Sequence, residues 1–308
     1  MRRIHKSLAR RFIEQIELQT MIFPGVILLL LFAYLPMYGV IMAFKNYTII
    51  SKSILSAPWV GLKFFEQALG DAYFLRSLRN SVGINILSLI IRFPAPIIFA
   101  ILLNEIKSEK FKRITQTVSY LPHFISWVIF SGIVMNILST ENGILNDVLI
   151  SLGLIEKPLF FMGDPKYFWW VAVLTLLAKD LGWGAIIYLS AIAGIDQEMF
   201  EAAHMDGVNR FQKIWYITLP SIMGTMVIIF ILTISNLLNW GFDQIFMLQN
   251  NVNISMAETL ETYVYKIGLK QMRFPYATAV GLMKSVIAVI LLVSADKFSK
   301  KTTGKGIY

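Results

Sequence analysis

Ionisable side chains stand inside the apolar runs of this sequence, where a charge is costly and therefore informative. They are Arg92, Lys179, Asp180, Asp243 and Lys284. A charged group at that depth indicates a transport pathway, a charged partner or a water-filled cavity. Lys179 and Asp180 are adjacent, so on a helix they point about 100° apart and each must find its own polar surroundings.

A second group of polar and aromatic residues recurs at three- and four-residue spacing: Asn236, Asn239, Trp240 and Asp243. That spacing predicts one shared helix face. Amides, a carboxylate and an aromatic ring suit a sugar, which offers hydroxyl groups and weakly apolar ring faces. The same face could instead supply interhelical hydrogen bonds, worth roughly 0.6 kcal/mol each. We predict that the substrate pathway is lined by Asn136, Lys179, Asp180, Trp183, Asn236, Asn239, Trp240 and Asp243.

The residue types needed for catalysis are not gathered anywhere in the sequence. His5, His123 and His204 are scattered, and none has a second His at metal-ligand spacing. The chain has no cysteine, which excludes disulfides and thiol nucleophiles. It also lacks a Gly-x-x-x-x-Gly-Lys-Ser/Thr phosphate loop. We therefore expect neither an enzyme nor a cofactor, and any ATP must be bound by another chain.

The composition predicts an integral membrane protein. Of its 308 residues 56% are hydrophobic and 15% are charged, against about 45–50% and 25% in a soluble domain. The net charge of +9 could suggest nucleic acid, but the basic residues cluster beside apolar runs, as in membrane proteins, so no nucleic acid partner is expected. A full-length apolar run follows the basic N-terminus without a cleavage site, which predicts an uncleaved first span.

The apolar runs predict an all-α membrane protein, because about 20 helical residues cross a bilayer. Six spans are expected, at residues 21–44, 77–103, 114–138, 167–195, 220–248 and 275–298. Pro94 and Pro96 predict a kink in the second span. Residues 1–20 are interpreted either as a helix on the membrane surface or as a solvated leader, and residues 299–308 as a tail.

The distribution of Lys and Arg predicts the orientation. The N-terminus, the 104–113 and 196–219 loops and the tail hold about fifteen, whereas the longer outer loops hold about nine. This bias predicts that both termini are cytoplasmic. No internal repeat is evident, and because secondary transporters often show repeats, a single permease subunit is favoured.

The inner segment 196–219 carries the most specific pattern. Glu201-Ala202-Ala203 favours a helix, and Gly207 permits a sharp change of direction. Phe211, Ile214 and Ile217 then recur at helical spacing, and Pro220 begins the next apolar run at a tolerated first-turn position. The expected shape is a helix, a glycine turn and a second helix that re-enters the membrane.

This pattern resembles the EAA loop of permease subunits in bacterial ABC importers. The residues in register are Glu201, Ala202, Ala203, Asp206, Gly207, Phe211, Ile217, Leu219 and Pro220. Val208 departs from the family, which usually has Ala there. In that family the loop forms a coupling helix that docks into a cleft on the cytoplasmic ATPase. The resemblance therefore implies that coupling to the ATPase involves Glu201, Ala202, Ala203, Met205, Asp206, Gly207, Phe211, Leu219 and Pro220.

Almost the whole chain resembles the sugar-type permeases of these importers, and in particular the LplB-like branch, named for polysaccharide and oligosaccharide uptake. Tyr120–Trp127 and Asn142–Asn146 carry that resemblance. It implies a type I ABC importer permease fold in the bacterial cell membrane. It also implies a second, non-identical permease subunit, two copies of an ATPase that binds ATP and Mg, and an extracytoplasmic sugar-binding protein that delivers the carbohydrate. Transport would proceed by alternating access.

Two alternative functions remain open from the sequence. EAA loops also occur in importers of amino acids, peptides and inorganic anions, so the solute need not be a sugar. The basic residues Arg92, Lys179 and Lys284 would suit an acidic sugar. A transporter driven by an ion gradient would instead use Asp180 or Asp243 as its ion site and would need no ATPase.

Overall fold

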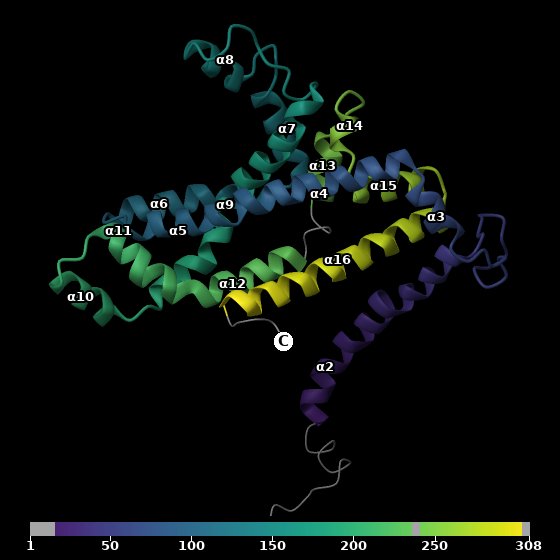
Figure 1. The fold of residues 1–308 in the computed structure, drawn as a ribbon, viewed down its shortest axis with the longest axis horizontal. Coiled ribbons are helices and arrows are strands. Elements are labelled where there is room, and N and C mark those ends of the chain that lie inside the picture. The colour runs from purple at the N-terminus through teal and green to yellow at the C-terminus, as the bar shows by residue number, and fades with distance from the viewer. Residues whose placement is uncertain (1–15, 236–240, 304–308) are drawn as a thin grey trace, which may run out of the picture.

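The computed structural model describes residues 16–235 and 241–303. Figure 1 shows the long helices α4 (Ala72–Arg92), α5 (Pro94–Asn104), α9 (Phe168–Ala193), α12 (Leu219–Ser235) and α16 (Phe274–Thr303) running alongside one another. No β-strand occurs within the described ranges, where Lys45 and Trp59 form an isolated bridge. The prediction of an all-α fold is therefore confirmed.

The remaining elements connect or flank these long helices. They are α2 (Ile16–Leu29), η1 (Leu30–Tyr34), η2 (Leu35–Phe44), α3 (Lys63–Leu69), α6 (Glu109–Tyr120), η3 (Leu121–Phe124), α7 (Trp127–Ile137), α8 (Ile144–Ser151), η4 (Pro165–Tyr167), α10 (Gln197–Met205), α11 (Arg210–Lys213), η5 (Ile214–Thr218), α13 (Phe242–Leu248), α14 (Ile254–Ala257), α15 (Leu260–Tyr265) and η6 (Lys266–Lys270).

Several of these elements join into helices that are long and apolar enough to cross a membrane. In the described part of the chain there are five: Ile16–Phe44, Ala72–Asn104, Pro165–Ala193, Arg210–Ile234 and Phe274–Ser294. A bent pair of helices makes six if it is counted as one span. The first 15 residues and the last five, with most of the predicted basic leader and part of the tail, lie outside the described residues.

The bent pair replaces the single span that the sequence predicts over 114–138. Glu109–Phe124 and Trp127–Ile137 meet at 108°. Pro122 lies in the 3₁₀ turn η3, Ile125 is extended, and the Ser126 side chain caps α7 by accepting from the amide of Ile129. A proline and a new N-cap within a few residues end one helix and start another, which is why the apolar run does not form one rod.

The predicted fifth span to Leu248 is also interrupted. Gly241 has a φ of +95° and precedes α13. A left-handed residue cannot continue an α-helix, so α12 and α13 are separate elements. Asp243 therefore does not share a helix face with α12. Asn236, Asn239 and Trp240 lie outside the described residues.

The centre of the bundle is α9. Its N-terminal half packs with α4, α7 and α13 around the buried Phe168, and its C-terminal half packs with α5 and α12 around the buried Tyr188. Gly182 lets α9 approach α6 closely, because a Cβ there would lie 2.3 Å from the carbonyl oxygen of Ser119.

Gly182→Ala is expected to destabilise the protein by about 1–3 kcal/mol, because the added methyl group meets rigid backbone rather than a movable side chain. The melting temperature of the purified protein in detergent measures this effect. Gly132→Ala is the matched control, since nothing lies within 4 Å of its added Cβ in α7. Equal melting temperatures for the two variants would contradict the close helix contact.

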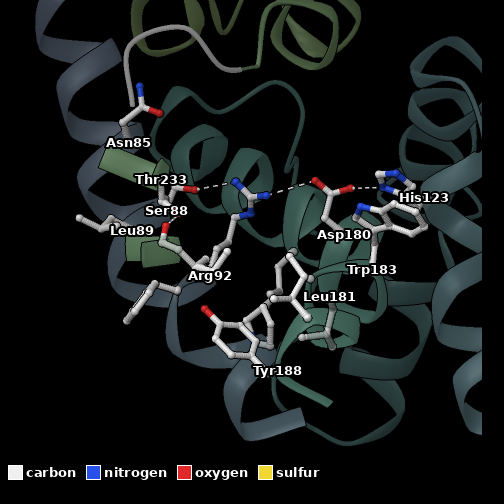
Figure 2. A pocket seen from close by; sticks show the side chains of 16 residues that line it. Asn85, Ser88, Leu89, Arg92, His123, Asp180, Leu181, Trp183, Tyr188 and Thr233 are labelled. Carbon is white, nitrogen blue, oxygen red and sulfur yellow. Dashed lines mark hydrogen bonds and ion pairs between the residues drawn. The ribbon is translucent and has the colours of Figure 1, made fainter. Parts of the chain in front are cut away.

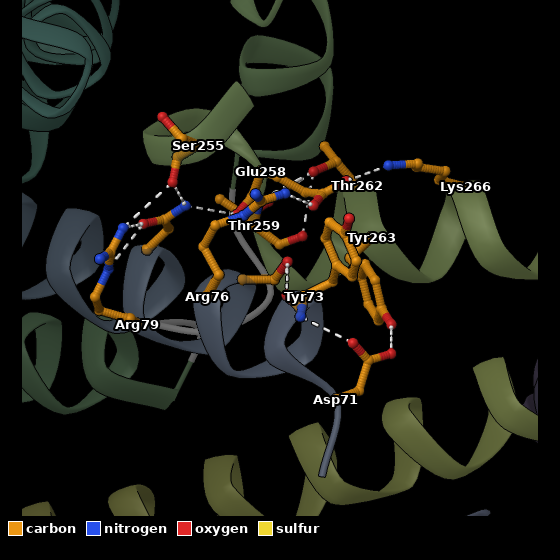
Figure 3. A network of polar contacts seen from close by, with 12 residues as sticks. Asp71, Tyr73, Arg76, Arg79, Ser255, Glu258, Thr259, Thr262, Tyr263 and Lys266 are labelled. Carbon is orange, nitrogen blue, oxygen red and sulfur yellow. Dashed lines mark hydrogen bonds and ion pairs between the residues drawn. The ribbon is translucent and has the colours of Figure 1, made fainter. Parts of the chain in front are cut away.

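Residues 249–274, expected as an outer polar loop, fold into short helices fixed against α4 by the polar network in Figure 3. Glu258 is 1% exposed and forms ion pairs with Arg76 at 2.8 Å and Lys266 at 3.0 Å. Asn80 donates to the carbonyl oxygens of Ser255 and Glu258. Buried polar groups satisfied in this way hold α14 and α15 in one position on the bundle.

Asp71 anchors the other end of this network. It caps α4 by accepting from the amide of Tyr73 at 2.8 Å, and it also accepts from the hydroxyls of Tyr263 and Tyr276. Burial alone would raise the pKa of Asp71, but the hydrogen bonds from the two tyrosines and the backbone outweigh burial and hold the pKa below its usual range.

Candidate functional site

The coupling segment, defined here as residues 196–220, forms a hairpin at one end of the bundle, where Figure 1 shows α10 protruding. Asp196 begins α10 by accepting from the amide of Glu198 at 3.0 Å. Gly207 ends it with a φ of +71°, a C-terminal cap that favours glycine. Asn209 and Gln212 form a reciprocal capping box at the start of α11.

The helix that follows the glycine turn runs unbroken from Arg210 to Ile234. Pro220 is therefore inside a continuous helix and not at the beginning of one, which corrects the sequence-based placement. The π-helical turn η5 directly precedes α12, whose second residue is Pro220. Such a turn changes the hydrogen-bonding register and accommodates the missing proline amide. As a result the part of the coupling segment from Arg210 onwards forms one continuous helix with the body of α12.

The surface of the coupling segment carries large apolar side chains among polar ones. Met205 is 86% exposed and Phe211 is 85% exposed. Glu201, Ala202 and Asp206 are exposed as well, while Ala203 is buried and Leu219 is half-buried. Large exposed apolar side chains beside polar ones mark a surface that contacts another protein or the membrane.

An intramembrane pocket of about 240 Å³ lies between α4, α5, η3, α9 and α12. Figure 2 shows Arg92, Asp180 and His123 in a row across it. Arg92 donates from Nη2 to Asp180 Oδ2 at 3.1 Å, and Asp180 Oδ1 lies 3.0 Å from His123 Nδ1. Trp183 stacks on the His123 ring with centroids 4.4 Å apart and planes 2° apart. The pocket therefore offers charge, hydrogen bonds and an aromatic face.

Tyr188 adds a hydroxyl to the lining of the same pocket. It is 2% exposed, and its Oη has no hydrogen-bond partner in the described part of the chain. A buried hydroxyl without a partner is costly, at roughly 1–3 kcal/mol. It is therefore available to a hydrogen-bonding group inside the pocket.

Lys179 is directed differently from its neighbour Asp180. Its Nζ donates to the carbonyl oxygens of Pro122 at 2.8 Å, His123 at 2.9 Å and Ile125. These carbonyls lie where α6 and η3 end, and helix-end carbonyls need external donors. Lys179 thus stabilises the break in the third span, and Asp180 fixes His123 in the same break.

Lys179→Met is expected to lower the free energy of unfolding by roughly 3 kcal/mol, because a buried helix end loses its donor. Thermal unfolding of the purified transporter measures the loss. Lys179→Arg is the control, since its guanidinium retains several donors. Substrate affinity in the folded fraction of the methionine variant should be unchanged, and a selective loss of affinity would contradict this structural role.

The structure brings together only part of the predicted pathway. Asp180 and Trp183 line the pocket, and Lys179 stands beside it. Asn136 is exposed on α7, which the bend in the third span directs away from the pocket. Asp243 is exposed on α13 and does not line the pocket either. Contact between substrate and any of these residues stays a prediction.

Several lining residues are absent from the sequence-based prediction. On α4 they are Asn85, Ser88 and Arg92, spaced three and four residues apart, which places them on one helix face. That spacing is a usable signal, as is the charge of Arg92. Tyr188 and Thr233 give no signal, because single hydroxyl groups in apolar runs usually bond to their own helix or pack.

The comparisons with known proteins identify the family. The model of the family described as "Binding-protein-dependent transport system inner membrane component" matches residues 78–304. The chain therefore belongs to this family of membrane components, and the recognition of an importer permease is confirmed.

Two relatives align with almost the whole chain, and one of them is named for polysaccharide transport. The chain is 40% identical over 291 residues to "Protein LplB" of Bacillus subtilis, covering 94% of this chain and 91% of that protein. It is 39% identical over 303 residues to the "Polygalacturonan/rhamnogalacturonan transport system permease protein YteP" of the same organism, covering 98% and 94%.

Solved structures agree with these sequence relatives. A chain of "a bacterial ABC transporter involved in the import of the acidic polysaccharide alginate" matches with a TM-score of 0.88 and 33% identity, covering 97% of this chain and 100% of that one. A chain of a bacterial alginate ABC transporter "in complex with alginate pentasaccharide-bound periplasmic protein" matches with a TM-score of 0.89 and 32% identity, covering 98% and 100%. The type I permease fold is confirmed.

Proposed function

We propose that this chain is a membrane-spanning subunit of an ATP-driven ABC importer that takes up an oligosaccharide by alternating access. One observation carries the mechanism. The helix Arg210–Ile234 starts in the coupling segment, and its Thr233 lines the intramembrane pocket. Displacement of the coupling segment by a moving ATPase would therefore reach the pocket through a single rigid element.

We expect different partners at the two ends of that helix. The exposed coupling segment fits a cleft on a cytoplasmic ATPase, which supplies the nucleotide site. Two ATPase copies and a second permease would complete the pathway, in the cell membrane of a bacterium. An extracytoplasmic binding protein would load the sugar at the opposite end, in line with the periplasmic protein in the alginate transporter complex. This arrangement has both termini of the chain in the cytoplasm.

The chemistry of the pocket favours a carbohydrate. Trp183 and His123 offer flat aromatic surfaces for a sugar ring, while Asp180, Ser88 and Tyr188 offer hydrogen bonds to hydroxyl groups. Arg92 adds a cation, which suits a uronate carboxylate. Two of the relatives are named for acidic polysaccharides, alginate and polygalacturonan, so an acidic oligosaccharide is the more specific proposal.

Reconstitution of the complete transporter in proteoliposomes tests the proposal. The probes are a uronic acid oligosaccharide and a neutral oligosaccharide of equal length, each supplied with the binding protein. We expect uptake to require ATP on the ATPase side and to favour the acidic probe. Uptake that continues without ATP and follows a proton or sodium gradient would instead support the alternative, an ion-driven transporter using Asp180 or Asp243.

A further inference from the structure

An apolar groove of about 380 Å³ runs along the outside of the bundle, separate from the intramembrane pocket and from the coupling segment. One wall is α4, with Gly83, Ile86 and Ile90 on one helix face. The other wall is the start of α9, with Trp169 and Trp170. Since Ile90 is 64% exposed and Trp170 52% exposed, this groove opens towards the surroundings of the bundle.

The floor of the groove is a fixed structure. Trp169 donates from Nε1 to the carbonyl oxygen of Met256 at 3.0 Å, which locks its indole in place. Gly83 makes room for that ring, because a Cβ at Gly83 would lie only 2.1 Å from it. The groove thus depends on one glycine and one positioned tryptophan, and its shape does not rely on mobile side chains.

Positive charge gathers at the end of the groove away from α10. Arg79, one helical turn from Gly83, donates to Met256 Sδ at 3.1 Å, to the carbonyl oxygen of Ser255 and to Asn80 Oδ1. Each of these three acceptors is a neutral group. Lys166 on the opposite wall forms an ion pair with Asp164 at 2.8 Å, so that cation is compensated. The end of the groove therefore carries a net positive charge.

We propose that this groove binds an anionic phospholipid, with an acyl chain along α4 and its phosphate beside Arg79 and Lys166. From Gly83 to Ile90 the helix rises about 10 Å, which accommodates part of one acyl chain. Arginine forms charge-assisted hydrogen bonds with phosphate oxygens. Tryptophan side chains favour the headgroup level, where such a phosphate lies.

Tryptophan quenching by brominated lipids tests the site in the complete purified transporter, reconstituted in phosphatidylcholine bilayers. The signal of Trp170 is the difference between wild-type protein and Trp170→Phe. We expect brominated phosphatidylglycerol to quench that signal at about fivefold lower mole fraction than brominated phosphatidylcholine, as roughly one interfacial cation would give. Arg79→Gln should bring the ratio close to one.

Three controls make the result decisive. Lys157→Gln removes an exposed cation from a different part of the outer surface and should leave the ratio unchanged. If Arg79→Gln fails to fold, Lys166→Gln replaces it as the test, because it removes the cation on the opposite wall of the groove. Equal quenching by both lipids would overturn the proposal, as would no quenching, which would mean that a partner subunit covers the groove. Loss of quenching on adding inorganic phosphate would also overturn it, since a free anion would then be the ligand.

Discussion

Gly207→Asp is expected to abolish the stimulation of ATP hydrolysis by the loaded binding protein while leaving the subunit folded. Nothing lies within 4 Å of a Cβ built at Gly207, and its φ of +71° is a region that Asp adopts at modest cost. The new carboxylate would, however, be desolvated in the ATPase cleft next to Asp206. An unpaired buried charge costs roughly 3 kcal/mol or more, on the order of 100-fold in docking affinity.

The measurement is substrate-stimulated ATPase activity and sugar uptake in the same proteoliposomes. Gly207→Asn is the matched control, because Asn has nearly the same shape and the same tolerance of a positive φ but carries no charge. It should retain most of the uptake. Uptake at the wild-type rate by Gly207→Asp would remove the coupling role from this turn.

Asp180→Asn is expected to lower sugar uptake by on the order of 10- to 100-fold. Asp180 holds Arg92 on one side and His123 on the other, and both contacts line the pocket. Removing one partner of a buried ion pair costs several kcal/mol, here roughly 2–3 because both side chains keep some exposure. The effect should appear in the rate of uptake and in the melting temperature of the transporter.

A double variant separates the structural role of this pair from its role in transport. Arg92→Gln combined with Asp180→Asn leaves no unpaired charge and should recover most of the melting temperature. Uptake should remain low if the pair contacts the sugar or moves during access. Recovery of uptake together with stability would contradict the assignment of the pocket to the pathway.

The coupling segment could be predicted from the sequence because its signals are local. A glycine at a left-handed position and a capping sequence specify a helical hairpin whatever packs around them, so the helix, turn and helix around Gly207 agree with the structure. The position of Pro220 was predicted wrongly because proline is compatible both with a helix start and with a π-helical turn before it.

The breaks within the spans could not be predicted with the same accuracy. Proline and glycine are tolerated inside membrane helices, so Pro122 and Gly241 do not by themselves distinguish a bend from a break. The break at Ser126 depends on Lys179, which is 54 residues away from the carbonyl of Ile125 that it binds. The lining of the pocket was only partly predicted for the same reason, since the bend decides that His123 enters the pocket and Asn136 does not.

The central claim is that the coupling segment transmits the motion of a cytoplasmic ATPase, and cross-linking from Met205 tests it most directly. The chain contains no cysteine, and Met205 is 86% exposed, so Met205→Cys provides a single attachment point for benzophenone maleimide on this chain, which is labelled before assembly with its partner subunits. We predict a light-dependent product between this chain and the ATPase, whose yield changes when ATP is added. If the introduced thiol formed no such product, or reacted with a membrane-impermeant maleimide from outside intact cells, the account would be contradicted.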